Sequence, residues 1–182
     1  MSPAWKHTLF AVLLLAAPAT PATPAMAQAP DLGISNAVAV EPGLVVAGQP
    51  TAQQIKAAGK AGFRTVFDLR SRIEDRGFDE EKVTGKAKMA YTNVEVTPDT
   101  LTQSKVLFFL MMLREAERPV LLHCSTGSRS AALYYSWLVL EKGMSEDQAL
   151  GQAQAAGLRD PLLAEAMKAL VADIKKSQRP TN

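Results

Sequence analysis

Short apolar runs alternate with longer amphipathic segments from about residue 44 onward. The apolar runs are rich in β-branched residues and are bounded by glycine, proline or polar residues, a pattern typical of strands. The last run is continuously hydrophobic, as in a strand buried inside a parallel sheet. The predicted strands are Leu44–Ala47, Thr65–Leu69, Tyr91–Val96 and Pro119–Leu122.

Helix-start and helix-stop signals separate and follow these strands. Thr51 with Gln54, Thr100 with Gln103 and Ser145 with Gln148 have the spacing of capping boxes. The predicted helices cover 51–62, the second half of 72–88, a buried segment containing 106–113, then 128–142, 145–157 and a last helix from 160. We therefore predict an α/β fold with a central, mostly parallel sheet of four or five strands, helices on both faces and a helical C-terminus.

Composition narrows the class of protein without naming it. The 182 residues are 47% hydrophobic and 21% charged, which indicates one globular domain and excludes a disordered chain or a coiled coil. A formal charge of +2 gives no electrostatic signal for nucleic-acid binding. One cysteine excludes a disulfide within the chain, and two histidines exclude a multi-histidine metal site. We therefore expect neither a metal ion nor another cofactor.

The N-terminus has the pattern of a cleavable signal peptide. Lys6 precedes the nine-residue apolar run Leu9–Ala17, and Ala25-Met26-Ala27 fits a cleavage site after Ala27. Nine residues are too few to span a bilayer, which needs about 20. We expect a secreted or periplasmic protein without a stable membrane anchor. The expected divisions are a signal peptide (1–27), a loose segment (28–42), a domain (43–175) and a tail (176–182).

The residue types with chemical potential concentrate in one loop, His123–Ser130 (HCSTGSRS), between the buried strand and a helix. A helix N-terminus attracts anions, and Gly127 allows the backbone to turn its amides inward. Arg129 can bind two oxygens of a phosphate, and the same positive field favours the thiolate of Cys124. Ser130 can hydrogen-bond that thiolate. A lone cysteine is commonly a small buried hydrophobe, but this position favours a nucleophile.

This loop resembles the phosphate-binding signature of cysteine-dependent tyrosine and dual-specificity phosphatases. More narrowly, the chain resembles the bacterial tyrosine-phosphatase-like family of beta-lactamase hydrolase-like proteins. That resemblance covers most of residues 40–170 and includes VVAGQP (45–50), AGFRTVFDLR (61–70) and GMSEDQAL (143–150). It implies a phosphatase fold and a phosphorylated protein or small phosphomonoester as substrate.

The resemblance also implies roles for the residues of the loop. Cys124 would form a thiophosphate intermediate and Arg129 would stabilise the phosphoryl oxygens. The amides that would bind these oxygens belong to Ser125, Thr126, Gly127 and Ser128. Apart from the resemblance, the lack of a second histidine after signal cleavage favours a structural role for His123, which would orient the loop by a backbone hydrogen bond.

Four residues separate Cys124 from Arg129, whereas tyrosine phosphatases normally have five. A loop of this length also occurs in rhodanese-type sulfurtransferases, which carry a persulfide. His123, Ser130 and the three following helices favour the phosphatase. Sulfur transfer through Cys124 remains an alternative, as does a phosphate-binding or redox-sensing module without catalysis.

A phosphatase also needs a general acid for the leaving oxygen. Asp99, after Pro98, resembles the acid of the mobile phosphatase loop and follows the third predicted strand. Glu95 and Asp75 are lesser candidates. Arg70 also lies at the expected active edge of the sheet and is a candidate for binding an anionic substrate.

The other charges after the second strand have a different interpretation. Acidic and basic residues alternate closely there, which is typical of a solvated surface. They are Arg72, Glu74, Asp75, Arg76 and Asp79.

Overall fold

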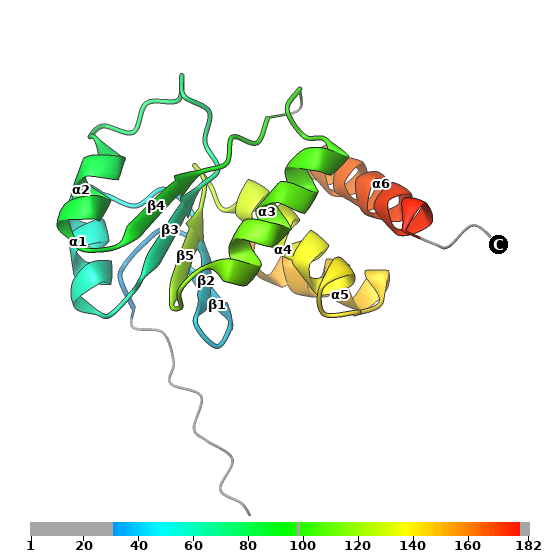
Figure 1. Cartoon of the computed structure of the whole chain (residues 1–182), viewed down its shortest axis with the longest axis horizontal. Helices are drawn as coiled ribbons and strands as arrows, with labels where there is room; N and C mark the ends of the chain where they lie inside the picture. The colour runs from blue at the N-terminus through cyan, green and yellow to red at the C-terminus, as the bar shows by residue number, and fades with distance from the viewer. Residues whose placement is uncertain (1–30, 98, 179–182) are drawn as a thin grey trace, which may run out of the picture.

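The computed structural model describes residues 31–97 and 99–178, and shows one five-stranded sheet between two layers of helices (Figure 1). The strand order is β1-β2-β5-β3-β4; β1 is antiparallel to β2, and the other pairs are parallel. The predicted α/β fold with a mostly parallel sheet is confirmed. The strands are β1 (Val38–Glu41), β2 (Leu44–Ala47), β3 (Thr65–Asp68), β4 (Ala90–Asn93) and β5 (Val120–His123).

Alternation along the strands divides the core into two clusters. Val66 and Leu121 pack with α1 and α2 on one face, while Phe67 and Leu122 pack with the other helices on the opposite face. The helices are α1 (Ala52–Lys60), α2 (Glu80–Lys86), α3 (Gln103–Glu115), α4 (Ser128–Leu140), α5 (Glu146–Ala155) and α6 (Pro161–Ser177). None of the described helices is both long enough and apolar enough to cross a membrane.

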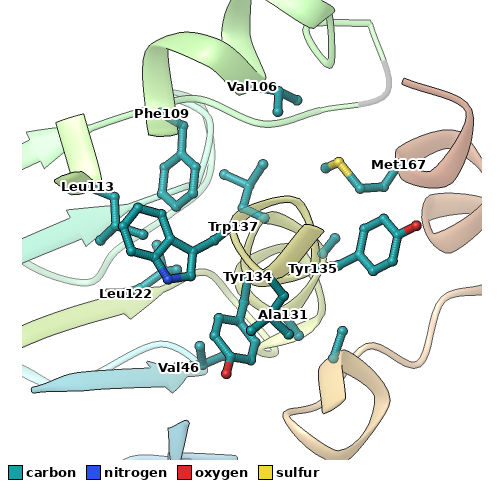
Figure 2. Packing of buried hydrophobic residues seen from close by; sticks show 14 of the residues in the cluster. Val46, Val106, Phe109, Leu113, Leu122, Ala131, Tyr134, Tyr135, Trp137 and Met167 are labelled. Atoms are coloured by element: carbon teal, nitrogen blue, oxygen red, sulfur yellow. The ribbon is translucent and has the colours of Figure 1, made fainter. Parts of the chain in front are cut away.

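Helix α4 lies at the centre of the larger helical layer. Figure 2 shows Trp137 directed toward Phe109 and Leu113 on α3, and Tyr135 on the side of Met167 on α6. Ten of the 13 residues of α4 are buried. Such close packing on several sides fixes the helix firmly, and with it the loop that precedes its N-terminus.

Three predicted boundaries are wrong. The loose segment 28–42 contains β1, because Val38–Glu41 finds a partner strand in β2. The tail does not begin at 176, since α6 continues to Ser177. The third predicted strand stops at Asn93 instead of Val96, where the chain leaves its regular pairing with β3.

The start of α3 also differs from the prediction. Its N-cap is Thr102, whose hydroxyl accepts from the Lys105 amide. Thr100 instead forms a local turn with Thr97 and donates its hydroxyl to the carbonyl of Glu95. The predicted signal peptide, its cleavage site and Pro98 lie outside the described residues.

Candidate active site

The loop between β5 and α4 places Cys124 at the N-terminus of a buried helix. Its Sγ accepts a hydrogen bond from the Gly127 amide at 3.1 Å, and the side chain is fully buried. Gly127 has φ +97°, in the left-handed region that favours glycine, and is the N-cap of α4. The sulfur therefore accepts from a backbone amide at the positive end of the α4 dipole, a position that favours negative charge.

Residues before and after β2 orient the peptide groups of this loop. The Asn36 side-chain amide donates to the Thr126 carbonyl at 2.9 Å, and the Gln49 amide donates to the Ser125 carbonyl at 3.0 Å. The C=O and N–H of one peptide point in opposite directions. Holding the Thr126 carbonyl outward therefore turns the Gly127 N–H inward, toward the sulfur.

Gly48 explains why the chain carries glycine after β2. A Cβ at this position would lie 2.9 Å from the Ser35 carbonyl oxygen and 3.2 Å from that of Ser125. Both approaches are closer than ordinary packing allows, so a side chain would displace the Ser35 carbonyl and crowd that of Ser125. The GQP part of the VVAGQP motif thus supports the Cys124 loop through backbone contacts.

Arg129, in the first turn of α4, is held by an acidic partner. Its two terminal nitrogens, Nη1 and Nη2, each lie 2.6 Å from an oxygen of Glu74. Nη1 also donates to the Val96 carbonyl at 3.1 Å, and Nη2 donates to Ser125 Oγ at 2.9 Å. This bidentate pair fixes the plane of the guanidinium group beside Cys124.

This ion pair changes the pKa of both residues so that each charged form is favoured. Hydrogen bonds from Arg129 lower the pKa of Glu74, and hydrogen bonds to Glu74 raise the pKa of Arg129 despite partial burial. Glu74 also accepts from the Ser71 amide at 2.8 Å. The sequence interpretation missed Glu74, because the neighbouring mixed charges made it look like part of a solvated surface.

Replacing Glu74 by glutamine should lower kcat/KM for an aryl phosphate by about tenfold, because Arg129 loses one of two fixed acceptors and its orientation. The melting temperature should change little, since Glu74 is partly exposed. Glu81→Gln, an exposed change on α2, is the matched control. An unchanged kcat/KM in Glu74→Gln would refute the orienting role.

Arg70 is buried and does not reach the cavity beside Cys124. Strand alternation directs it, with Asp68, to the face of the sheet opposite Cys124, where it bonds Asp68 and Glu80. Asp68 also accepts from Arg76 at 2.8 Å and from the Tyr91 hydroxyl at 3.0 Å. The predicted substrate-binding role of Arg70 is therefore wrong, since its guanidinium is neutralised inside the protein.

His123 belongs to the same buried cluster. Its Nε2 lies 2.8 Å from Glu80 Oε1, and both side chains are fully buried. Consecutive strand residues face opposite sides, so His123 and Cys124 point to opposite faces of the sheet. Candidate ligand atoms of Asp68, Glu80 and His123 lie within 4.8 Å of one another. Arg70 and Arg76 already supply positive charge to these carboxylates, so the cluster fits an ion-pair network better than a metal site.

Two serines of the loop have structural partners. Ser130 Oγ donates to the Ala47 carbonyl at 3.0 Å, so the predicted hydrogen bond to the thiolate is absent from the described contacts. Ser128 Oγ accepts from the amides of Arg159 and Asp160 at 3.3 and 3.4 Å. The loop is thereby tied to β2 on one side and to the start of α6 on the other.

A cavity of about 1090 Å³ opens beside the loop. Arg129, Thr126 and Ser128 line it, as do Glu74 and Thr97. Asp99 is exposed in the turn that follows Thr97, whereas Asp75 is held in a local turn by the Gly77 amide. The structure thus brings the Cys124 loop, Arg129 and the segment bearing Asp99 to one side of the sheet.

A family model for the DSP-PTPase phosphatase fused to NAD+ kinase matches residues 34–169, which include every loop residue described above. The chain belongs to this phosphatase family. The match confirms the expected relationship to cysteine-dependent phosphatases of the dual-specificity and tyrosine type.

Curated relatives agree with this family. The dual-specificity protein phosphatase TpbA of Pseudomonas aeruginosa is 31% identical over 170 residues, which are 86% of this chain and 75% of TpbA. A beta-lactamase hydrolase-like protein of Agrobacterium fabrum is 31% identical over 103 residues, covering 54% of this chain. The chain spans about a quarter of the length of the beta-lactamase hydrolase-like relatives that it matches.

Solved structures share the phosphatase fold. TpbA of P. aeruginosa superposes with a TM-score of 0.63 at 27% identity, covering 83% of this chain and 91% of TpbA. A cysteine-to-serine form of TpbA in complex with phosphotyrosine gives a TM-score of 0.63 at 25% identity, covering 82% of this chain and 90% of that one. A DUF442 phosphatase of Shewanella putrefaciens, at 21% identity and a TM-score of 0.66, covers 81% of this chain and 93% of its own, and supports the fold.

Proposed function

We propose that this chain hydrolyses phosphomonoesters, with phosphotyrosine in proteins as the main substrate class, through a cysteinyl-phosphate intermediate. The observation that carries the proposal is the position of Cys124 Sγ, which accepts from the Gly127 amide at the start of α4. The relative TpbA, known in complex with phosphotyrosine, supports the choice of substrate.

The first chemical step is attack of the Cys124 thiolate on phosphorus. A sulfur–phosphorus bond forms as the bond from phosphorus to the aryl oxygen breaks, and the leaving oxygen takes a proton from an acid. Charge on the phosphoryl oxygens is balanced by loop amides and by Arg129, whose orientation Glu74 fixes. Water then attacks phosphorus as the sulfur–phosphorus bond breaks, and the deprotonated acid of the first step takes a proton from the water, which releases phosphate and restores the thiolate.

Asp99 is the proposed acid for the first step. Its replacement by asparagine should lower kcat for phosphotyrosine by about 100-fold, the lower end of the usual contribution of general acids. The loss should be smaller for p-nitrophenyl phosphate, because nitrophenolate leaves without full protonation. Glu95→Gln, at the lesser candidate on the same segment, should leave kcat unchanged. Equal kcat for Asp99→Asn and the parent protein on phosphotyrosine at acidic pH would exclude Asp99.

The deciding experiment supplies the purified, reduced protein with p-nitrophenyl phosphate in one assay and with thiosulfate plus cyanide in the other. Phosphate release that vanadate inhibits, together with a phosphorylated Cys124 peptide after rapid acid quench, is the expected result. Thiocyanate formation without phosphate release would instead assign sulfur transfer. If neither phosphate nor thiocyanate forms, the proposed catalytic activity is contradicted and the protein is better described as an anion-binding module.

We also propose that the enzyme acts after export. The proposal rests on Lys6, the Leu9–Ala17 run and the Ala25-Met26-Ala27 cleavage pattern. A mature protein that begins at Gln28 is expected, and N-terminal sequencing of the exported form measures this.

A further inference from the structure

The cavity beside Cys124 continues well beyond the phosphate-binding loop. Its volume of about 1090 Å³ exceeds the range of about 300–1,000 Å³ that holds an entire drug-sized ligand. One aryl phosphate therefore fills only part of it. The additional wall is one face of α6, formed by Leu162, Leu163, Ala166, Ala169, Leu170 and Asp173.

These α6 residues recur at intervals of three and four, so they form a single stripe along the helix. The stripe starts close to the active site, because the amides of Arg159 and Asp160 donate to Ser128 Oγ in the Cys124 loop. At about 1.5 Å per residue, Leu162 to Asp173 covers about 16 Å. An extended peptide rises about 3.3 Å per residue, so about five residues match this length.

The stripe is apolar along most of its length and acidic at its far end. Leu162 is 82% exposed and lines the same cavity as the half-buried Leu163 and Leu170, so the leucines form an accessible apolar patch. Ala166 and Ala169 are also exposed, so the wall is shallow enough to admit side chains. Asp173 lies exposed at the far end, where a basic side chain would complement it.

This combination favours a peptide over a lipid. The hydrocarbon chain of a phosphorylated lipid gains nothing from a carboxylate at the end of its groove, and close contact would cost desolvation of Asp173. A peptide supplies both features at once, since apolar side chains can contact the leucines and a lysine or arginine can reach the carboxylate.

We propose that the face of α6 defined above, which we call the α6 groove, selects phosphotyrosine sites with leucine-like neighbours and a basic residue about five positions away. The proposal rests on the phosphatase activity proposed above and adds a substrate preference to it. Arg129 and Cys124 act on the phosphate, while Ala169 and Asp173 discriminate among the sequences that carry it.

Two phosphotyrosyl peptides of equal length test the preference. One has leucine on both sides of phosphotyrosine and lysine five positions away on both sides, and the other has serine at all four positions. The leucine–lysine peptide should have a kcat/KM about tenfold higher, the gain from partial burial of one leucine side chain. Equal values for the two peptides would refute the groove as a specificity site.

Ala169→Glu places a long charged side chain in the groove, and Ala172→Glu makes the same change at an exposed position of α6 outside it. Ala169→Glu should remove the preference, whereas Ala172→Glu should retain it. Both variants should hydrolyse p-nitrophenyl phosphate like the parent protein. An equal loss of preference in both variants would contradict the proposal.

Asp173→Lys adds a charge-reversal test. This variant should prefer a peptide with glutamate in place of the distant lysines, and retention of the lysine preference would overturn the assignment of Asp173.

A binding assay tests the groove without turnover. The affinity of Cys124→Ser for the same peptides is measured by fluorescence anisotropy. Failure of p-nitrophenyl phosphate hydrolysis would then refute the proposed activity alone, whereas equal binding of all peptides would refute the groove.

A short-chain phosphatidylinositol monophosphate serves as the lipid probe. Its hydrolysis by the parent protein should be insensitive to Ala169→Glu. A strong loss in Ala169→Glu for the lipid, with none for the leucine–lysine peptide, would assign the groove to lipids and overturn the peptide proposal.

Discussion

Replacing Cys124 by serine should lower turnover of p-nitrophenyl phosphate by at least about 10⁴-fold, the scale seen when a covalent nucleophile is removed. A serine hydroxyl stays protonated beside the same amide and helix dipole that favour a thiolate. The serine oxygen is also smaller than the sulfur that accepts the 3.1 Å hydrogen bond from the Gly127 amide. Turnover is measured as phosphate release under reductant.

The substituted protein should still bind phosphate, because Arg129 and the loop amides remain in place. Vanadate or phosphate binding by calorimetry tests this, and circular dichroism checks the fold. Ser136→Ala, a buried change on the central helix α4, controls for general loss of packing. Phosphate release that persists in Cys124→Ser at a tenth or more of the parental rate would contradict Cys124 as the nucleophile.

The second large effect concerns stability. Asp68→Asn should reduce the free energy of unfolding at neutral pH by about 3 kcal/mol, the usual cost of leaving buried charges without their partner. Asp68 bonds both Arg70 and Arg76, and Arg70 is completely buried. An asparagine keeps the size of the side chain but leaves Arg70 with Glu80 as its carboxylate partner and, among the described contacts, leaves Arg76 without one.

The effect should depend on pH in a defined direction. Burial alone would raise the pKa of Asp68, but hydrogen bonds from Arg70 and the charges of His123 and Arg70 outweigh it and lower that pKa. The carboxylate therefore stabilises the fold above the unfolded-state pKa of about 3.9, and this contribution disappears as the pH falls through the lower folded-state value. Asparagine does not titrate, so the difference from the parent protein should shrink on acidification.

Urea unfolding at neutral and acidic pH measures both effects. Asp173→Asn, an exposed aspartate on α6, should leave the unfolding midpoint within experimental error. Equal midpoints for Asp68→Asn and the parent protein at neutral pH would show that the buried network does not stabilise the fold.

The sequence allowed the α/β class and four of the five strands to be predicted, because hydrophobic pattern and turn residues are local signals. Strand β1 was not predicted, since it is short, has no buried residue and pairs with the sheet through β2. The α3 cap was misplaced by two residues for a similar reason. Thr100 has the capping-box spacing with Gln103, but its turn with Thr97 leaves Thr102 as the residue that caps the helix.

The candidate site shows the same division between local and distant signals. The loop from Cys124 to Arg129 could be found because strand, glycine and arginine are adjacent in sequence. Glu74 could not be found in this way, because it lies 55 residues from Arg129 in the sequence and the two residues meet only in the folded protein. Arg70 was misassigned because position at a strand end does not reveal which face of the sheet a side chain reaches.

The contact from Asn36 to the Thr126 carbonyl has a practical consequence for dissecting the domain. A shorter clone that starts at residue 43, a natural choice from the hydrophobic pattern, would retain the nucleophile and its arginine. It would lose the amide that holds one peptide group of the loop in its turned orientation, together with the edge strand β1. The smallest fragment worth expressing for kinetics therefore begins ahead of Ser35.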